Sequence, residues 1–262
     1  MTRISTPVSR SLPRWKWSII LNLFILPFRP KQSAAKYARI WDPVTGSPLL
    51  HHTKRQTELL QKQFPDLPVR FGMMIGKPPL ATAVREMIAQ GVTRLIALPM
   101  FPQYSATTSA SATDCLFNAL KQERRVPALR VVTSYHDHPA YLDAVAAVVS
   151  EDLAKRETQP DHLVISFHGI PVKYVERGDP YPEQVKQTTA ALVEYLKLQP
   201  GKWTQTFQSR FGKSEWLQPY TDDVLAKLAR DGVKRVAVAL PGFTADCLET
   251  LDEIGHESAE VF

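Results

Sequence analysis

Cysteine is scarce in this sequence, whose 262 residues include only Cys115 and Cys247, far apart and without a CxxC pair. That scarcity argues against a disulfide framework and against a cysteine-held metal cluster, and it fits a reducing cytoplasm. The sequence also has no low-complexity tract, no internal repeat and no nucleic-acid-binding motif. Nucleic acid is therefore not an expected partner.

A hydrophobic run long enough to cross a bilayer is also lacking, since a spanning helix needs roughly 20 apolar residues. The nearest approach is the run from Trp17 to Phe28 (residues 17–28), which Asn22 and Pro27 interrupt and which basic residues precede. We expect this run to form an apolar helix in a pocket wall or on a membrane surface. An ordinary core helix is the alternative.

Neither sign of charge dominates, because 32 Lys and Arg stand against 26 Asp and Glu, giving a formal charge of +6. The basic residues are scattered along the chain, so their excess indicates either attraction to an anionic ligand or membrane, or simply a cationic surface. With 44% hydrophobic and 22% charged residues, the chain has the composition of a globular protein with a buried core.

Short apolar runs alternate with amphipathic segments along the chain, which is typical of strands that alternate with helices. The predicted strands are residues 69–75, 93–100, 129–134, 161–167, 203–209 and 234–240. The predicted helices are residues 78–90, 113–124, 139–155, 182–197, 221–230 and 246–256. Continuous apolar strands between helices indicate parallel sheets covered on both faces. We therefore expect an α/β fold with two doubly wound, Rossmann-like lobes, over residues 1–135 and 136–262.

Folds of this class bind ligands beyond the carboxyl ends of their strands. The site is therefore expected after Met100, Phe167, Ser209 and Leu240. His168 directly follows the apolar strand at 161–167, and Gly169 comes next. An imidazole in that place can accept a proton or bind a metal, and a hydrogen-bonded structural histidine is the alternative.

Carboxylates recur in the segment that follows the last predicted strand. The spacing of an α-helix would put Asp246, Glu249 and Glu253 on one face, with His256 one turn further on. Such a line of hard oxygen ligands suits a divalent cation or a path for protons. An N-cap at Asp246 with Glu249 as its reciprocal partner is the structural alternative.

Two other segments after strands are rich in hydroxyls or in aromatic rings. Residues 99–111 carry a run of Ser and Thr with Tyr104, which favours either the wall of a ligand cleft or simple capping of a helix. In residues 207–223, Trp216 and Tyr220 stand in a loop with Gly212 and Pro219. These rings can stack on a flat macrocycle or anchor the loop.

Several segments, in order and over nearly the whole chain, resemble the ferrochelatase family. They are ILPFRPKQSAAKYARIW, GSPLLHHTKRQ, PQYSATTSAS, SFHGIP, RGDPYPEQ, FQSRFGKSEWLQPYTDD and PGFTADCLETLDEI. The form TADCLETL is similar to that of the proteobacterial branch. An ordered series of matches is far more specific than any single segment.

The resemblance implies roles for individual residues. His168 stands at the family's active-site histidine and Glu249 at the essential glutamate across the cleft, so both are candidate catalytic residues and metal ligands. Asp246 and Glu253 stand at further acidic positions and are candidate metal ligands. Cys247 stands where some relatives have a second histidine, whose role therefore does not transfer. Porphyrin contacts are implied for Arg29, Tyr104, Ser105 and Trp216.

The resemblance also implies an activity, the insertion of ferrous iron into protoporphyrin IX to form protohaem, by a lyase of haem biosynthesis with a chelatase-type fold. No cofactor beyond the substrate iron, and no iron–sulfur cluster, is expected. The expected location is the cytoplasm, with peripheral membrane contact through residues 17–28 as an option. The residues leave open whether His168 acts as a base or as a metal ligand.

Relatives begin with a strand that reads like LLVNLGTP, and they continue beyond the position of Phe262 with a further strand and helix. The resemblance therefore implies that this chain lacks the family's first strand and its C-terminal helix. A chelatase for another metal or tetrapyrrole is one alternative. A non-catalytic, tetrapyrrole-binding remnant of such an enzyme is another.

Overall fold

The computed structural model describes residues 29–262, with the backbone alone for residues 29–32. The apolar run at residues 17–28 falls outside this range. Within the range, no helix is long and apolar enough to cross a membrane. The chain divides into two compact units, each with its own parallel sheet.

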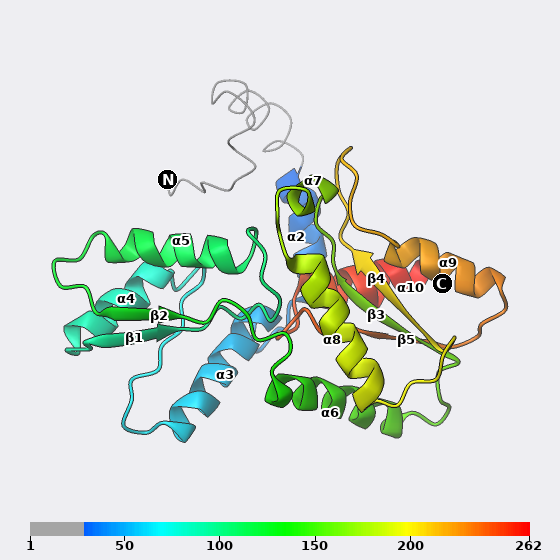
Figure 1. Cartoon of the computed structure of the whole chain (residues 1–262), viewed down its shortest axis with the longest axis horizontal. Helices are drawn as coiled ribbons and strands as arrows, with labels where there is room; N and C mark the ends of the chain where they lie inside the picture. The colour runs from blue at the N-terminus through cyan, green and yellow to red at the C-terminus, as the bar shows by residue number, and fades with distance from the viewer. Residues whose placement is uncertain (1–28) are drawn as a thin grey trace. The chain divides into compact units, whose positions relative to one another are not determined.

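The first unit takes in the chain up to Pro99, together with Ala106–Val131 and Ala245–Leu248. β1 and β2 pair in parallel, and α4 and α5 bury Val84 and Leu116 against Leu95 of β1. The elements of this unit are α2 (Arg29–Ile40), α3 (Pro48–Gln63), α4 (Leu80–Ala89), β1 (Arg94–Ala97), α5 (Ser109–Leu120) and β2 (Ala128–Val131), as Figure 1 shows.

The second unit comprises Met100–Ser105, Val132–Thr244 and Glu249–Phe262. Its three strands run parallel in the order β4-β3-β5, so β3 lies at the centre of the sheet. Its elements are α6 (Pro139–Lys155), β3 (His162–His168), α7 (Val172–Val175), α8 (Tyr181–Tyr195), β4 (Trp203–Gln208), α9 (Thr221–Arg230), β5 (Val236–Ala239), the π-helix η3 (Glu249–Ser258) and α10 (Ala259–Val261).

One face of the second sheet is apolar. Side chains alternate between the two faces of a strand, so Leu163, Ile165 and Phe167 of β3 share one face. They form the core of this unit with Val185 of α8, and Leu153 of α6 packs against them. Full burial of a side chain of this size stabilises the fold by about 1.5–3 kcal/mol. This cluster therefore anchors β3, whose last residue is His168.

The opposite face of the same sheet is polar toward its carboxyl end. Ser166 and His168 of β3 lie beside their register partners Thr206 and Gln208 of β4. Thr221, the first residue of α9, donates a hydrogen bond from its hydroxyl to Thr206 Oγ1 (2.9 Å). A buried hydroxyl is stable only when it is hydrogen-bonded, so this face is built around polar contacts rather than apolar packing.

The predicted parallel α/β fold is confirmed, but the strand predicted over residues 69–75 is wrong. That segment turns back on the start of α4, where Met73 N donates to Pro78 O (2.8 Å) and Leu80 N donates to Met73 O (3.1 Å). It makes an isolated bridge between Met73 and Pro79. The segment thus pairs with the residues that lead into α4 instead of joining β1 and β2.

The helix that follows β5 is the π-helix η3 rather than the α-helix predicted over residues 246–256. A π-helix closes its hydrogen bonds from i to i+5 instead of i+4. Asp246 precedes η3 and belongs to the first unit, whereas Glu249 and Glu253 belong to the second. The prediction that these three carboxylates share one helical face is therefore wrong.

Candidate active site

The candidate site lies at the carboxyl end of the second sheet, where β3 ends in His168 and β4 ends in Gln208. The two residues are register partners. His168 is partly exposed, and its Nδ1 lies 2.6 Å from the carbonyl oxygen of Gly169. Because a carbonyl oxygen only accepts, Nδ1 carries the ring proton in this contact. Nε2 then has the free lone pair that a base or a metal ligand needs.

A tyrosine supports His168 from behind. Tyr181 Oη donates to the backbone oxygen of His168 (2.9 Å), and Tyr181 N donates to Asp179 Oδ1 (3.1 Å). Asp179 Oδ2 accepts from Ser105 Oγ (2.8 Å). Burial, with smaller contributions from Tyr141 and Asp179, raises the pKa of Tyr181 above its usual value. The phenol therefore remains protonated and keeps donating to the strand end.

Ser105 and Tyr104, both predicted to contact porphyrin, have different surroundings. Ser105 is fully buried and its hydroxyl is engaged by Asp179, so in this structure it braces the support behind His168. Tyr104 is half-buried, and its backbone N–H donates to Gln184 Oε1 of α8 (2.7 Å). Both residues lie in the same unit as His168.

Trp216 lies next to His168. The loop after β4 pairs with the segment after β3, since Val172 N donates to Glu215 O and Leu217 N donates to Ile170 O, both at 3.0 Å. This pairing puts the Trp216 ring 6.4 Å from the imidazole of His168, tilted by 45°. Trp216 is only 5% exposed. Its ring therefore packs beneath the site as a wall and presents little free surface.

The acidic helix η3 meets the end of β4. Gln208 Nε2 donates to the backbone oxygen of Glu249 (3.0 Å) and lies 3.4 Å from Glu253 Oε2. Ser209 donates to Glu253 Oε1 from its N–H and to Oε2 from its hydroxyl, both at 2.6 Å. Glu253 is thus held by the end of β4, and Glu249 begins its helix beside the register partner of His168.

The two remaining predicted residues, Asp246 and Arg29, belong to the first unit. Asp246 is exposed, and His52 Nε2, in the same unit, lies 3.8 Å from its Oδ2. For Arg29 the structure describes the backbone in α2 but not the side chain. Among the residues with described side chains, no group of three His, Cys, Asp or Glu side chains is close enough to hold a metal ion.

Sequence reasoning missed Ser166, Gln208 and Ser209. Ser166 is fully buried among the apolar residues 163–165 and Phe167 of β3, and Gln208 is 4% exposed at the end of β4. A polar residue inside an apolar run is a signal that could have found Ser166, because burial of a polar group requires a specific partner. Gln208 and Ser209 give no such signal, since the strand WTQTFQ, which ends in Gln208, is itself largely polar. The candidate site therefore includes residues of β3 and of the end of β4 that the sequence motifs did not single out.

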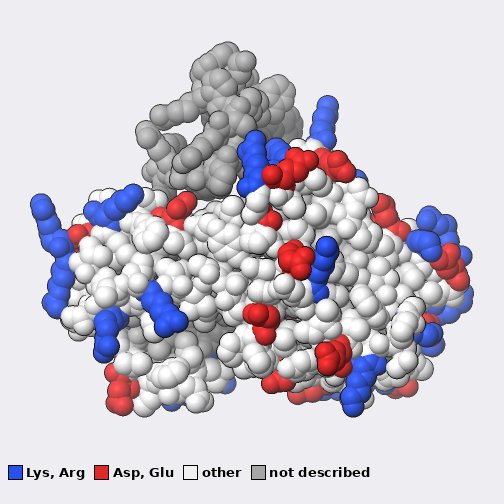
Figure 2. All heavy atoms as spheres, viewed as in Figure 1, with Lys and Arg blue, Asp and Glu red and all other residues white. Residues whose placement is uncertain are grey.

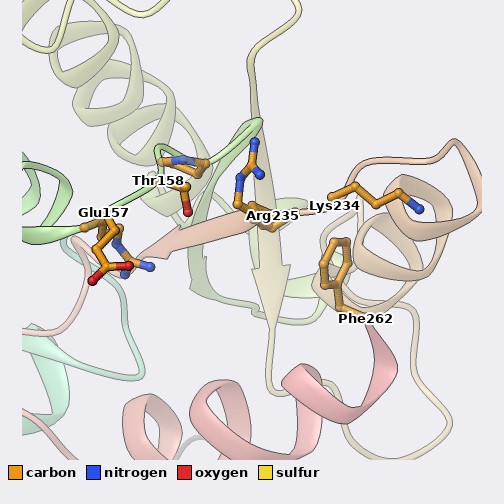
Figure 3. A pocket seen from close by; sticks show the side chains of 8 residues that line it. Glu157, Thr158, Lys234, Arg235 and Phe262 are labelled. Atoms are coloured by element: carbon orange, nitrogen blue, oxygen red, sulfur yellow. The ribbon is translucent and has the colours of Figure 1, made fainter.

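The charged surface and the cavity at the other end of the second sheet give no comparable site. Lys and Arg are spread over the face in Figure 2, with Asp and Glu among them. A cavity of about 480 Å³ lies at the amino ends of β3 and β5 (Figure 3), the far end of the sheet from His168. Arg235, which lines this cavity, already donates to Asp161 Oδ1 (2.7 Å) and to Gln159 O (2.9 Å).

The family model for ferrochelatase matches residues 6–262 of the chain. The ferrochelatase of Mesorhizobium japonicum is 45% identical, over 99% of this chain and 74% of the relative. That of Azoarcus sp. is 47% identical, over 99% of this chain and 72% of the relative. That of Pectobacterium atrosepticum is 45% identical, over 95% of this chain and 78% of the relative.

Among solved structures, the chain resembles SirB from Bacillus subtilis with Fe3+, at a TM-score of 0.56. The two share 15% sequence identity, and the match covers 83% of this chain and 80% of that chain. At this identity the likeness concerns the fold alone. It agrees with the predicted chelatase-type α/β architecture.

Proposed function

The chain belongs to the ferrochelatase family, whose members insert ferrous iron into protoporphyrin IX, and we propose that it does so with His168 and Glu249 as its catalytic pair. The observation that carries the proposal is the position of Gln208. This residue is the register partner of His168 and donates to the backbone oxygen of Glu249 (3.0 Å). His168 and Glu249 thus both neighbour Gln208, although they belong to different elements.

His168 serves as the proton acceptor in this proposal. Insertion of iron releases two protons from the pyrrole nitrogens of the porphyrin, so a base must stand beside the macrocycle. The Nδ1–H contact to Gly169 O leaves the Nε2 lone pair for that task.

Glu253 and Glu249 have different roles in this proposal. Glu253 accepts two hydrogen bonds of 2.6 Å from Ser209, so its carboxylate is already committed to holding η3 against β4. Glu249 starts the same helix and is partly exposed. Glu249 is therefore the carboxylate that receives the incoming cation or the second proton. Trp216 and Tyr181 keep the end of β3 in place.

An iron-insertion assay tests the proposal. Purified protein is mixed anaerobically with ferrous iron and protoporphyrin IX, and the loss of porphyrin fluorescence and the gain of haem absorbance are followed. His168→Ala should lower the rate by about 100-fold or more, as expected for loss of a general base. Glu249→Gln should lower the rate while porphyrin binding, measured by fluorescence without iron, stays intact.

Matched variants separate chemistry from folding. His256→Ala and Glu260→Gln change an exposed imidazole and an exposed carboxylate on η3 and α10 and should retain the wild-type rate. Normal turnover by His168→Ala would overturn the assignment of the base. Loss of porphyrin binding in Glu249→Gln would make Glu249 a structural residue.

A further inference from the structure

A buried hydroxyl stands two residues before His168, on the same face of the sheet. Ser166 is fully buried, and every other residue of β3 that is buried with it, apart from His162, is apolar. Burial of a hydroxyl costs free energy unless a hydrogen bond compensates. Valine or alanine would pack there without that cost, so the hydroxyl indicates a specific partner.

The partner is the side-chain amide of Gln208. Ser166 Oγ donates to Gln208 Oε1 (2.9 Å), and it also lies 2.8 Å from Thr221 Oγ1 of α9. An amide oxygen only accepts hydrogen bonds, and an amide nitrogen only donates them. A hydroxyl can donate or accept, whereas the backbone oxygen of Glu249 only accepts, so the contact of Nε2 with Glu249 fixes the amide and leaves Oε1 for the hydroxyl of Ser166.

The other end of the amide faces the acidic helix. Gln208 Nε2 donates to the backbone oxygen of Glu249 (3.0 Å) and, at the longer distance of 3.4 Å, to Glu253 Oε2. Gln208 is 4% exposed, so water does not readily replace either contact. The amide is a rigid link from a hydroxyl in the sheet to the first turn of η3.

We propose that Ser166 and Gln208 are positioning residues. Together they hold one buried side-chain amide in a fixed orientation, and this amide sets the position of Glu249, at the start of η3, relative to His168. This inference rests on the proposed function, since it concerns the geometry of the same pair. It assigns no substrate contact to either residue. Its distinctive consequence is that a donor is required at the η3 end of the link and a hydrogen-bonding group at residue 166.

The variant Gln208→Glu tests that requirement because it keeps the shape and the acceptor but replaces the donor. Ionised, the new carboxylate faces Glu249 O and the Glu253 carboxylate, and kcat should fall about 100-fold with KM for porphyrin within about twofold, a loss set by repulsion of like charges. Protonated, it can donate again. The ratio of variant to wild-type kcat should therefore recover as pH falls, and a loss in kcat without a change in KM is what a general structural defect would not show.

Ser166→Ala tests the other end of the link and should lower kcat about 10-fold, as loss of one buried hydrogen bond implies. The matched control is Thr204→Ala, which deletes a side-chain contact between the same strands at their other end, His162 Nε2 to Thr204 Oγ1 (2.9 Å). That control should keep the wild-type kcat. Backbone hydrogen exchange in η3, measured without substrate, should be faster in Ser166→Ala than in Thr204→Ala.

The outcomes separate the two proposals. A wild-type protein that inserts iron, with Gln208→Glu equally impaired at every pH or Ser166→Ala unimpaired, overturns the positioning role alone. A wild-type protein that inserts no iron overturns the proposed function. In that case unchanged exchange of η3 in Ser166→Ala would overturn the positioning role as well, and faster exchange would support it.

Discussion

Ser209 holds the carboxylate of Glu253 with two hydrogen bonds of 2.6 Å, one from its backbone N–H and one from its hydroxyl. Ser209 adopts φ +64°, in the left-handed region that residues other than glycine rarely enter. Its position directly after β4 places this conformation where the chain leaves the sheet. Such a conformation is maintained only when its surroundings fix it, and here a carboxylate on η3 does so.

Two substitutions of Ser209 should therefore differ in stability. Ser209→Ala loses a hydrogen bond to a charged group, worth about 1.5–3 kcal/mol, and keeps the left-handed backbone. Ser209→Gly loses the same bond but relieves about 1 kcal/mol of backbone strain. Ser209→Gly should thus be the more stable variant by about that amount in urea unfolding. Equal stability, or a more stable alanine variant, would contradict this account of the strand end.

Gly169, the residue after His168, should not tolerate a side chain. A Cβ there would lie 3.1 Å from the backbone oxygen of Gln208 and 3.3 Å from Cε3 of Trp216. Gly169→Ala is expected to lose about 1–3 kcal/mol of unfolding free energy, the usual cost of overpacking. It should also slow iron insertion, because the two groups that must move flank His168.

Gly255→Ala is the control for that experiment. Gly255 is exposed in η3, and the nearest heavy atom to its added Cβ would be Thr250 O at an ordinary 3.6 Å. Alanine is also the better helix former. Thermal unfolding should place Gly255→Ala at or above the wild type and Gly169→Ala well below it. Similar midpoints for the two variants would show that the site has room next to His168.

Much of the second sheet can be predicted from the sequence because burial leaves a strong pattern. The apolar run before His168 gives β3 to within one residue at each end. The helices Pro139–Lys155 and Thr221–Arg230 follow with their observed bounds. Placement of His168 at a strand end is thus a local property of the sequence.

The π-helix is not predictable in the same way. The acidic spacing of residues 246–256 is compatible with an ordinary α-helix, and what distinguishes η3 lies outside its own sequence. Gln208 and Ser209 hold its first turns, and Ser258 Oγ donates to Asp222 Oδ1 of α9 (2.6 Å) at its end. These partners are far away in the chain, so only the folded structure brings them to the helix.

Three tyrosines, of which Tyr181 is buried and Tyr135 and Tyr141 are half-buried, should make the protein sensitive to alkali. Burial is the main cause that raises the pKa of Tyr135, Tyr141 and Tyr181 above the usual value of a phenol. The unfolded chain loses these protons near pH 10, whereas the folded chain keeps them. The stabilisation that the protonated phenols contribute is therefore fully present below about pH 10, and the free energy of unfolding falls as pH rises above that value.

A spectrophotometric titration of phenolate absorbance checks this expectation. Of the eight tyrosines in the sequence, three should ionise only when the protein unfolds, and all should titrate together in concentrated guanidinium chloride. Tyr181→Phe should remove one of the late-titrating groups. Complete and reversible ionisation of every tyrosine in the folded protein would refute the burial of this group.

His162, at the start of β3, should make the protein sensitive to acid. Burial, followed by the nearby charge of Lys202, lowers the pKa of His162 below its ordinary value of 6.5. The unfolded chain therefore takes up a proton at a pH where the folded chain does not. The stability from the neutral imidazole is complete above about pH 6.5 and is lost as pH falls below it, at no more than about 1.4 kcal/mol per pH unit.

Replacement of His162 isolates this contribution, because the imidazole lies at the opposite end of β3 from His168. Urea unfolding of wild type and His162→Gln should be compared at about pH 7.5 and about pH 5.5, on either side of the ordinary value for histidine. The wild type should lose more free energy of unfolding on acidification than His162→Gln, although the variant starts lower because Thr204 has a poorer partner. Thr204→Ala keeps the imidazole and should retain the wild-type dependence on pH. Parallel losses in wild type and His162→Gln would mean that other groups cause the acid sensitivity, and that the amino end of the sheet does not exclude a charged histidine.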